Sequence, residues 1–398
     1  MNYRMRKLKY KALASFVITA AIVMGCIEPY ALEGVESNPD FLVVDGFIDA
    51  SNLTATVKLS RAIGLDDGNY YPAVRNARVV IASESGEEIQ LQQVDLTQHP
   101  EYDTGTYVAF DIALDPTQRY KLGIALNNGS KQYESDYITI EKAAPIESVA
   151  WDIRGDDMRI LVNSVESNDN SPFYRWRYEE TWEYNSALYS TFYMDADREM
   201  IFRPFDEQIY TCYRNEPSFE ILVGSSQNLN SNVIRNYPVR SVPRNSIKIS
   251  RMYSINIKQY GLTEDAYTYW LDLYKTTEST GGLFDPMPGQ IFGNIHAVSN
   301  PSEMVIGYFS ASTVEEKRVF IERRELPAEF TNYRHPFCDS DTVFNEDLQF
   351  VSPGTTFYNA VYDAMGLTVI GYTISSLNCL DCRVSGGGST SKPDNWPR

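Results

Sequence analysis

Four cysteines and one histidine are the residues whose types and spacing could most directly do chemistry. His335 and Cys338 form an H-x-x-C pair, Cys379 and Cys382 form a C-x-x-C pair, and Cys212 stands alone. Such spacings let ligands share one tetrahedral zinc ion. A C-x-x-C pair can also exchange disulfides when a helix N-terminus lowers the pKa of one thiol. In an exported chain, an even number of cysteines instead indicates disulfides.

The first 26 residues bear on this choice, because they set the compartment. Five basic residues lie within residues 1–11, an apolar run covers residues 12–23, and the segment ends in Val23-Met24-Gly25-Cys26. The apolar run has the length of a signal-peptide core and is too short to span a membrane. Its end looks like a bacterial lipobox, whose cysteine is diacylated and becomes the mature N-terminus. We therefore predict a signal peptide over residues 1–25 and lipidation of Cys26, with an ordinary signal peptide as the alternative.

Export to an oxidising compartment favours two disulfides among the other four cysteines. Three pairings are possible, and the sequence does not choose between them. Zinc is the second interpretation. A redox-active pair ranks third, because no thioredoxin-like βαβ pattern surrounds it. We predict no metal site and no cofactor, and the disulfide candidates are Cys212, Cys338, Cys379 and Cys382.

Composition and motifs narrow the function classes. The 398 residues include 35 basic and 53 acidic ones, a formal charge of −18. Loss of residues 1–25 removes five basic residues and no acidic one, so the mature charge is −23. Such a chain repels polyphosphate, which argues against nucleic-acid binding. We find no G-x-S-x-G, H-E-x-x-H, P-loop or dinucleotide motif, and we predict that the protein is not an enzyme. A two-carboxylate hydrolase would carry no such motif and stays an alternative.

The element pattern predicts a mainly β fold. Residues 26–40 read as a lipidated tether, whose acidic residues are either a surface-export signal or a solvated linker. Short strands separated by turn residues over 41–144 indicate an immunoglobulin/transthyretin-like β-sandwich. A larger β-rich domain is expected over 145–383, with one helix near 263–279. Residues 384–398 form a Gly/Ser-rich tail.

One expected strand of the larger domain has an unusual pattern. Over residues 173–184 the aromatic side chains alternate with charged ones, so the aromatic residues share one face. We interpret that face as core and the charged face as a site of cross-strand ion pairs. Glu180 is the mixed position of this pattern.

Several blocks carry a family resemblance. They are FLVVDGFID, AYTYWLDLYKTTESTGGLFDPMPGQI, GNIHAVSNPSEMVIGYFSAS and CLDCRVSGGGSTSKPDNWP, in this order along the chain. Together they resemble the bacterial outer-membrane lipoprotein family catalogued as domain of unknown function 4249. The third block and the C-terminal block, C-x-x-C…GG…KP…W, are the most specific. We expect structural roles for the third, in which the glycines would be positions of backbone constraint. Its positions are Gly293, Asn294, Asn300, Gly307, Tyr308, Phe309 and Ser312.

The resemblance implies a lipidated β-rich protein that is often encoded beside a TonB-dependent outer-membrane receptor, and it implies no catalytic residues. The expected function is thus a non-catalytic accessory of such a receptor, anchored to the outer membrane by lipid, at the cell surface or on the periplasmic face. It would capture or present a nutrient, or gate the receptor. The alternatives are a hydrolase acting on peptide or glycan and a structural adhesion or envelope-assembly module.

Overall fold

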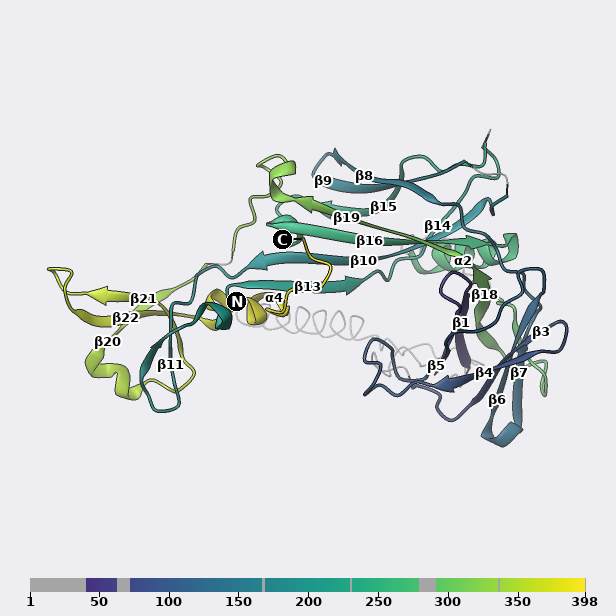
Figure 1. The fold of residues 1–398 in the computed structure, drawn as a ribbon, viewed down its shortest axis with the longest axis horizontal. Helices are drawn as coiled ribbons and strands as arrows, with labels where there is room; N and C mark the ends of the chain where they lie inside the picture. The colour runs from purple at the N-terminus through teal and green to yellow at the C-terminus, as the bar shows by residue number, and fades with distance from the viewer. Residues whose placement is uncertain are drawn as a thin grey trace, which may run out of the picture. The chain divides into compact units, whose positions relative to one another are not determined.

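The computed structural model describes residues 41–62, 72–166, 169–229, 231–278, 291–335 and 337–397. The predicted signal peptide, Cys26 and the tether lie outside these residues. The chain is mainly β with few helices, as the sequence predicted (Figure 1). Among the described residues, no helix is long and apolar enough to cross a membrane.

The first sheet has nine strands in the order β17-β7-β6-β3-β4-β5-β2-β1-β18. All its described pairs are antiparallel except β1 with β18, which run parallel from Leu42↔Val305 to Asp49↔Ser312. Its strands are β1 (Leu42–Asp49), β2 (Thr54–Arg61), β3 (Arg78–Ser83), β4 (Glu88–Gln93), β5 (Thr106–Ala109), β6 (Tyr120–Leu126), β7 (Lys131–Ser135), β17 (Ile295–Ala297) and β18 (Val305–Ser312).

Alternation within these strands builds one core. Strand β1 buries every second residue and β2 does the same, as expected when one sheet face is covered. Side chains from both end strands, including Ile295 of β17 and Phe309 of β18, join the same cluster as Leu42 and Leu122. Residues 295–312 thus contribute to a sheet that the sequence analysis placed within 41–144. The sequence analysis missed this contribution because parallel pairing between distant segments leaves no local signal. The sandwich form of this region stays a prediction.

A second core lies between two further sheets. One has the order β13-β10-β16-β19, with β14 also paired to β10, and the other has the order β15-β9-β8. The aromatic face of β10 is buried in this core, as predicted. The strands are β8 (Ile146–Arg154), β9 (Asp157–Ser164), β10 (Phe173–Asn185), β13 (Thr211–Pro217), β14 (Leu222–Ser225), β15 (Tyr237–Pro243), β16 (Met252–Leu262) and β19 (Val314–Glu322).

Two separate excursions of the chain, residues 186–210 and 337–377, form the last sheet, which we call the insert sheet. The excursions pair through Phe192↔Phe357 and Tyr193↔Thr356. The strand order is β12-β11-β21-β22-β20 (Figure 1). The strands are β11 (Phe192–Met194), β12 (Met200–Phe202), β20 (Ser340–Phe344), β21 (Thr356–Tyr362) and β22 (Val369–Ser375).

The main helix is α2 (Glu264–Glu278), close to the predicted bounds. Thr263 caps it by accepting from the Ala266 N–H, and Ala266 and Tyr269 pack against Phe173 in a small third cluster. Short helices α3 (Leu377–Leu380) and α4 (Cys382–Gly386) follow β22. The 3₁₀ turns are η1 (Asn127–Gly129), η2 (Phe205–Glu207), η3 (Ile247–Ile249), η4 (Arg323–Glu325) and η5 (Asn345–Phe350).

Candidate functional site

The block around Asn294 joins the two ends of the nine-stranded sheet. The Asn294 side chain donates to the Phe309 carbonyl and accepts from the Phe309 N–H, both at 2.8 Å. Strand β18 is the end of the sheet, so these two groups lack a neighbouring strand on that side. The Asn294 carbonyl accepts from the Asp136 N–H at 2.8 Å, immediately after β7, and β17 begins at Ile295. The residue immediately before β17 therefore caps the outer edge of β18 with its side chain, and we call this contact the seam.

Glycine is required on both sides of the seam. A Cβ on Gly293 would overlap the Gly307 carbonyl, and a Cβ on Gly307 would overlap the Val44 carbonyl of β1. Gly307 also has a φ of +133°, which L side chains rarely adopt. The expected backbone constraint at these two positions is thus visible as close backbone approach.

The remaining residues of the block also make contacts within the fold. Phe309 is fully buried in the first core, and Tyr308 packs on Tyr269 of α2 with 5.0 Å between ring centroids. Asn300 accepts from the Ser302 hydroxyl at 2.7 Å in a surface turn. Ser312 is buried, and its hydroxyl has no hydrogen-bond partner in the described part of the chain. None of these contacts outlines a ligand site.

The four candidate cysteines form two disulfides, Cys212–Cys382 and Cys338–Cys379. The expectation of disulfides is confirmed, and the pairing that the sequence left open is now defined. The two cysteines of the C-x-x-C pair belong to different bridges, so no thiolate of the four is left for zinc or for exchange. Burial lowers the pKa of His335. Within the described ranges, no group of three or more His, Cys, Asp or Glu side chains could hold a metal ion.

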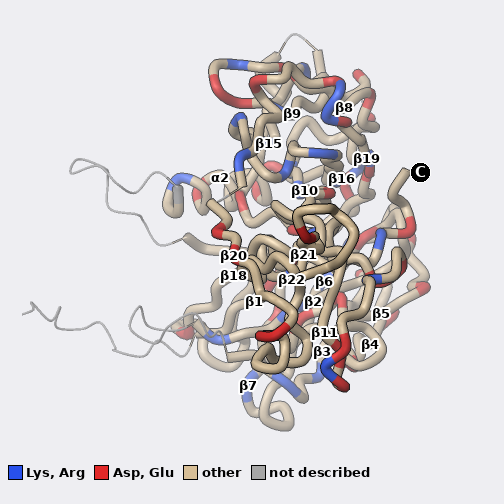
Figure 2. The backbone as a smooth tube through the Cα atoms, turned by 90° about the vertical axis from the view of Figure 1, so that its left-hand side faces the viewer, with Lys and Arg blue, Asp and Glu red and all other residues tan. Residues whose placement is uncertain are grey.

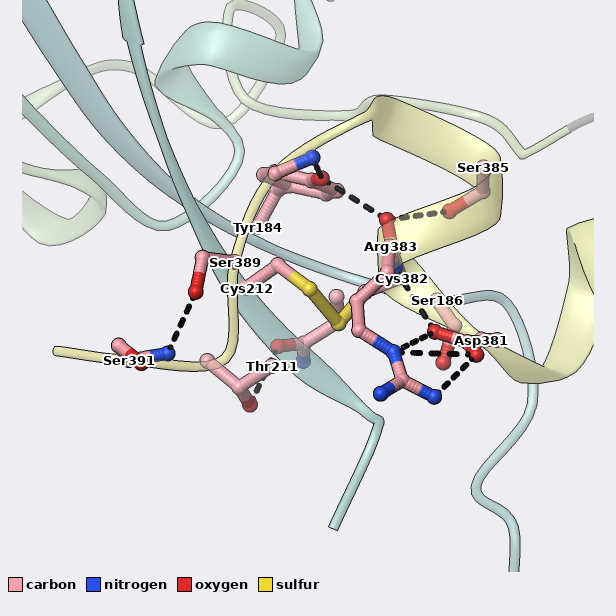
Figure 3. Close-up of a disulfide and its surroundings, with 12 residues drawn as sticks. Tyr184, Ser186, Thr211, Cys212, Asp381, Cys382, Arg383, Ser385, Ser389 and Ser391 are labelled. Atoms are coloured by element: carbon pink, nitrogen blue, oxygen red, sulfur yellow. Dashed lines mark hydrogen bonds and ion pairs between the residues drawn. A yellow bond between two sulfur atoms is a disulfide. The ribbon is translucent and has the colours of Figure 1, made fainter. Parts of the chain in front are cut away.

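The Cys212–Cys382 bridge begins a C-terminal segment, residues 381–397, that we call the strap (Figure 3). Asp381 accepts from the Arg383 N–H and so caps α4. The Tyr184 hydroxyl donates to the Cys382 carbonyl at 2.8 Å and accepts from the Gly388 N–H at 2.9 Å. A Cβ on Gly388 would overlap the Tyr184 hydroxyl, which explains the glycine run.

The end of the strap is anchored as well. Trp396 is only 5% exposed, packs against Tyr213 and Phe320, and donates from Nε1 to Glu183 at 3.2 Å. The Gly/Ser-rich segment expected as a tail is thus docked on β10, β13 and β19. The tryptophan was the available signal, because an indole placed in a polar tail commonly marks an anchor.

The main buried charged cluster surrounds Glu180, the mixed position of β10. Its side chain is 4% exposed and accepts from the Tyr253 hydroxyl at 2.7 Å, Arg240 Nε at 3.1 Å and Lys248 Nζ at 2.6 Å. Burial and the Glu180 charge raise the pKa of Tyr253 well above its ordinary value. This carboxylate is fully coordinated by its neighbours.

Two further carboxylates complete the cluster at the wall of a 420 Å³ cavity. Glu216 binds Lys248 at 2.9 Å, and Glu220 accepts from the Tyr178 hydroxyl at 2.7 Å. Burial alone would raise the pKa of both carboxyls, but these hydrogen bonds and the nearby Lys248 and Arg240 charges outweigh it and leave both pKa values lowered. A general acid needs the opposite shift. Figure 2 marks such acidic and basic positions along the chain.

The insert sheet differs from the rest of the structure in what it exposes. Within its five described strands, Met194 and Phe357 are the only large apolar side chains that are buried. No residue of the sheet belongs to the three hydrophobic clusters. Large apolar side chains are instead exposed on its strands and connections. They are Phe202, Phe205, Phe344, Phe350, Tyr362, Met365 and Leu367.

The same two excursions are strongly acidic. Residues 186–210 and 337–377 contain ten acidic side chains and two basic ones. None of these ten carboxylates forms an ion pair with a described residue. The sequence analysis missed this surface. Its available signal was the local excess of acidic and aromatic residues after residue 336.

Comparison with family models gives a match to the domain of unknown function DUF4249 over residues 27–318. The match covers more than half of the chain. The protein belongs to the DUF4249 family. No curated protein matched it.

The DUF4249 match contains the seam, from Gly293 to Ser312, together with β10 and its charged cluster. Strands β20 to β22, three of the four bridging cysteines and the strap lie after residue 318. Family membership therefore bears on the nine-stranded sheet and on most of the second core. Of the insert sheet it includes only β11 and β12, so that β20 to β22 are interpreted from their own side chains.

Proposed function

We propose that the protein is a lipid-anchored, non-catalytic accessory subunit of a TonB-dependent outer-membrane receptor and that it docks through the insert sheet. The lipobox ending at Cys26 supports the anchor, and the DUF4249 resemblance supports the type of partner. The observation that carries the proposal is the exposed apolar surface of the insert sheet.

A sheet normally buries at least one face against another element. The insert sheet has almost no core of its own, while Phe205 is 89% and Phe350 is 78% exposed. Contiguous exposed apolar residues mark interaction surfaces, and aromatic side chains are the residues that such interfaces use as anchors. A partner would supply the missing cover.

Charge indicates the chemistry of that partner. The ten carboxylates of the two excursions form no ion pair with a described residue, and they would be repelled by an anionic membrane surface. A protein surface with basic residues around an apolar patch would complement them. We therefore commit to a basic, apolar face of the receptor as the occupant.

The charged cluster around Glu180 supports a non-catalytic role. Its three carboxylates are matched by Arg240, Lys248 and two tyrosine hydroxyls, and the pKa values of Glu216 and Glu220 are lowered. A hydrolase with two carboxylates needs one that stays protonated near neutral pH. Neither Glu216 nor Glu220 offers such an acid, and the paired charges suit fold stability.

Site-specific photocrosslinking in the native membrane tests the proposal. Benzoylphenylalanine is placed at Phe205 or Phe350 and, as a control, at Phe110, which is 49% exposed beyond β5. We expect the first two probes to crosslink one integral outer-membrane protein, identified by mass spectrometry, and the control to give none. Crosslinks to lipid, to a second copy of the chain or to no protein would contradict the proposal.

The anchor needs its own control. Cys26→Ser removes the lipid acceptor, so the protein should leave the membrane fraction. If the variant stays in the membrane fraction, the prediction that Cys26 is lipidated is wrong, whatever the crosslinking experiment shows.

A further inference from the structure

A second surface of the molecule has the properties of a small-ligand site. A groove of about 580 Å³ lies between the ends of β10, β16 and β19 and the chain that follows them. This volume is within the range of small-molecule pockets. We call it the arginine groove. It is lined by Glu183, Arg251, Met252, Glu322, Arg323, Arg324, Leu326, Ala328 and Thr331.

Two of the three arginines in the groove are already paired. Arg251 Nε donates to Glu183 at 2.6 Å. Arg324 contacts Glu322 through two nitrogens, at 2.8 and 3.0 Å. Glu183 also accepts from Trp396 of the strap. Both carboxylates of the lining are therefore satisfied from within the protein.

Arg323 is the exception. Its backbone N–H donates to the Arg251 carbonyl at 2.8 Å, which fixes the start of η4. Its guanidinium has no hydrogen-bond or ion-pair partner among the described residues, although it lines the groove. Three positive and two negative side chains leave one positive charge, and a single anionic group would balance it. A guanidinium binds carboxylates through two parallel hydrogen bonds.

Apart from Thr331, the rest of the lining is apolar. Leu326 is 7% exposed, and Met252 and Ala328 contribute further carbon surface beside it. A ligand that placed its charge on Arg323 could thus rest an apolar part on this floor. Because the whole chain is strongly negative, long-range attraction would not draw an anion in, and the local contacts must supply the affinity.

We propose that the arginine groove binds a monoanionic group carried on an apolar body, with Arg323 as the anion-binding residue. A fatty acid and the free C-terminus of an apolar peptide share this chemistry. The inference goes beyond the proposed docking on a receptor and does not depend on it.

The test measures direct binding to the full-length lipoprotein in nanodiscs by isothermal titration calorimetry, with empty nanodiscs subtracted. The probes are octanoate against octanol and N-acetyl-Ala-Leu-Leu as free acid against its amide, so the two sources of the anion are separated. We expect at least one acid to bind ten times more tightly than its uncharged counterpart. No receptor is present, so this result is independent of the crosslinking experiment.

Variants then assign the site. Arg323→Gln should weaken the acid at least tenfold, while Arg75→Gln, which removes an exposed arginine outside the groove, should leave binding unchanged. Ala328→Asp should also abolish binding, because it adds a negative charge to the floor. Thermal unfolding verifies that each variant is folded. The inference is overturned if no probe binds at millimolar concentration, if acid and neutral probes bind alike, or if Arg323→Gln and Arg75→Gln behave alike.

Discussion

The nine-stranded sheet and the insert sheet solve the same physical problem in opposite ways. A sheet leaves unpaired backbone groups at its edges and an apolar face that needs cover. In the nine-stranded sheet, the Asn294 side chain joins the start of one end strand, β17, to the outer edge of the other, β18, and one continuous core fills the interior. In the insert sheet, the end strands β12 and β20 have no further strand beside them among the described residues. Met194 and Phe357 are the only large apolar side chains of its described strands that are buried.

This difference indicates that the nine-stranded sheet serves stability and that the insert sheet serves binding to a partner. The nine-stranded sheet draws its stability from packing, so its sensitive positions are core residues and close backbone contacts. The insert sheet is held by strand pairing and by the Cys338–Cys379 bridge at its base. Its exposed aromatic side chains add little to folding and remain free for a partner. Each prediction below tests one side of this contrast.

The largest effect is expected from Gly307→Ala in the seam. The added methyl would overlap the Val44 carbonyl and break the parallel pairing of β1 with β18. We expect a loss of more than about 4 kcal/mol in urea unfolding, or no folded protein. Gly366→Ala is the matched control, because Gly366 also has a positive φ, +72°, but nothing lies within 4 Å. It should cost only about 1–2 kcal/mol. Equal losses would refute the overlap.

The next effect is local and belongs to the insert sheet. The Cys338–Cys379 bridge spans 41 residues, and the chain-entropy relation gives about 4 kcal/mol for such a loop. The double change Cys338→Ser with Cys379→Ser should therefore speed hydrogen exchange in β20 and β22. Strands β1 and β18 should keep their protection. If exchange rises equally in both sheets, they are one cooperative unit and the contrast fails.

A smaller effect is expected at Asn294. Asn294→Ala leaves the N–H and carbonyl of buried Phe309 without partners, which should cost about 3 kcal/mol in the free energy of unfolding. Asn300→Ala provides the control within the same block, because this asparagine bonds only in a surface turn around Ser302. It should cost about 0.5–1 kcal/mol. If both substitutions cost the same free energy of unfolding, the hydrogen bonds between Asn294 and Phe309 contribute no more to stability than a surface turn does, and the proposed role of the seam is wrong.

The sequence predicted the local features of this structure well. Period-two alternation in β1, β2 and β10 identified strands and their buried faces, and the Thr263 cap with its apolar stripe identified α2. Export context identified disulfides. Each of these signals lies within a short window or follows from composition.

Features that depend on contacts between distant segments could not be predicted from the sequence. The pairing of β1 with β18 joins residues 263 positions apart, and the choice of Cys212–Cys382 over other pairings depends on how β13 meets the strap. The arginine groove likewise needs Glu183 and Arg323 to meet across β16. No local sequence pattern predicts such long-range contacts, because they follow from the packing of whole sheets.

The smallest effect is expected from a comparison at acid and neutral pH. It distinguishes an ion-paired carboxylate of the second core from a carboxylate of the insert sheet that has no ion pair with a described residue. The pKa of Glu216 is lowered in the fold from an ordinary value of 4.5, since Lys248 and Arg214 outweigh its burial. A lowered pKa contributes stability above pH 4.5 that is lost as the pH falls through the lower, folded value. Glu216→Gln should thus cost about 0.5–1 kcal/mol at pH 7 and less at pH 3, in urea unfolding at each pH. Glu346→Gln in the insert sheet should show no loss at either pH, because Glu346 forms no ion pair with a described residue. A pH-independent cost at Glu216 would show that packing, and not the ion pair, holds that side chain.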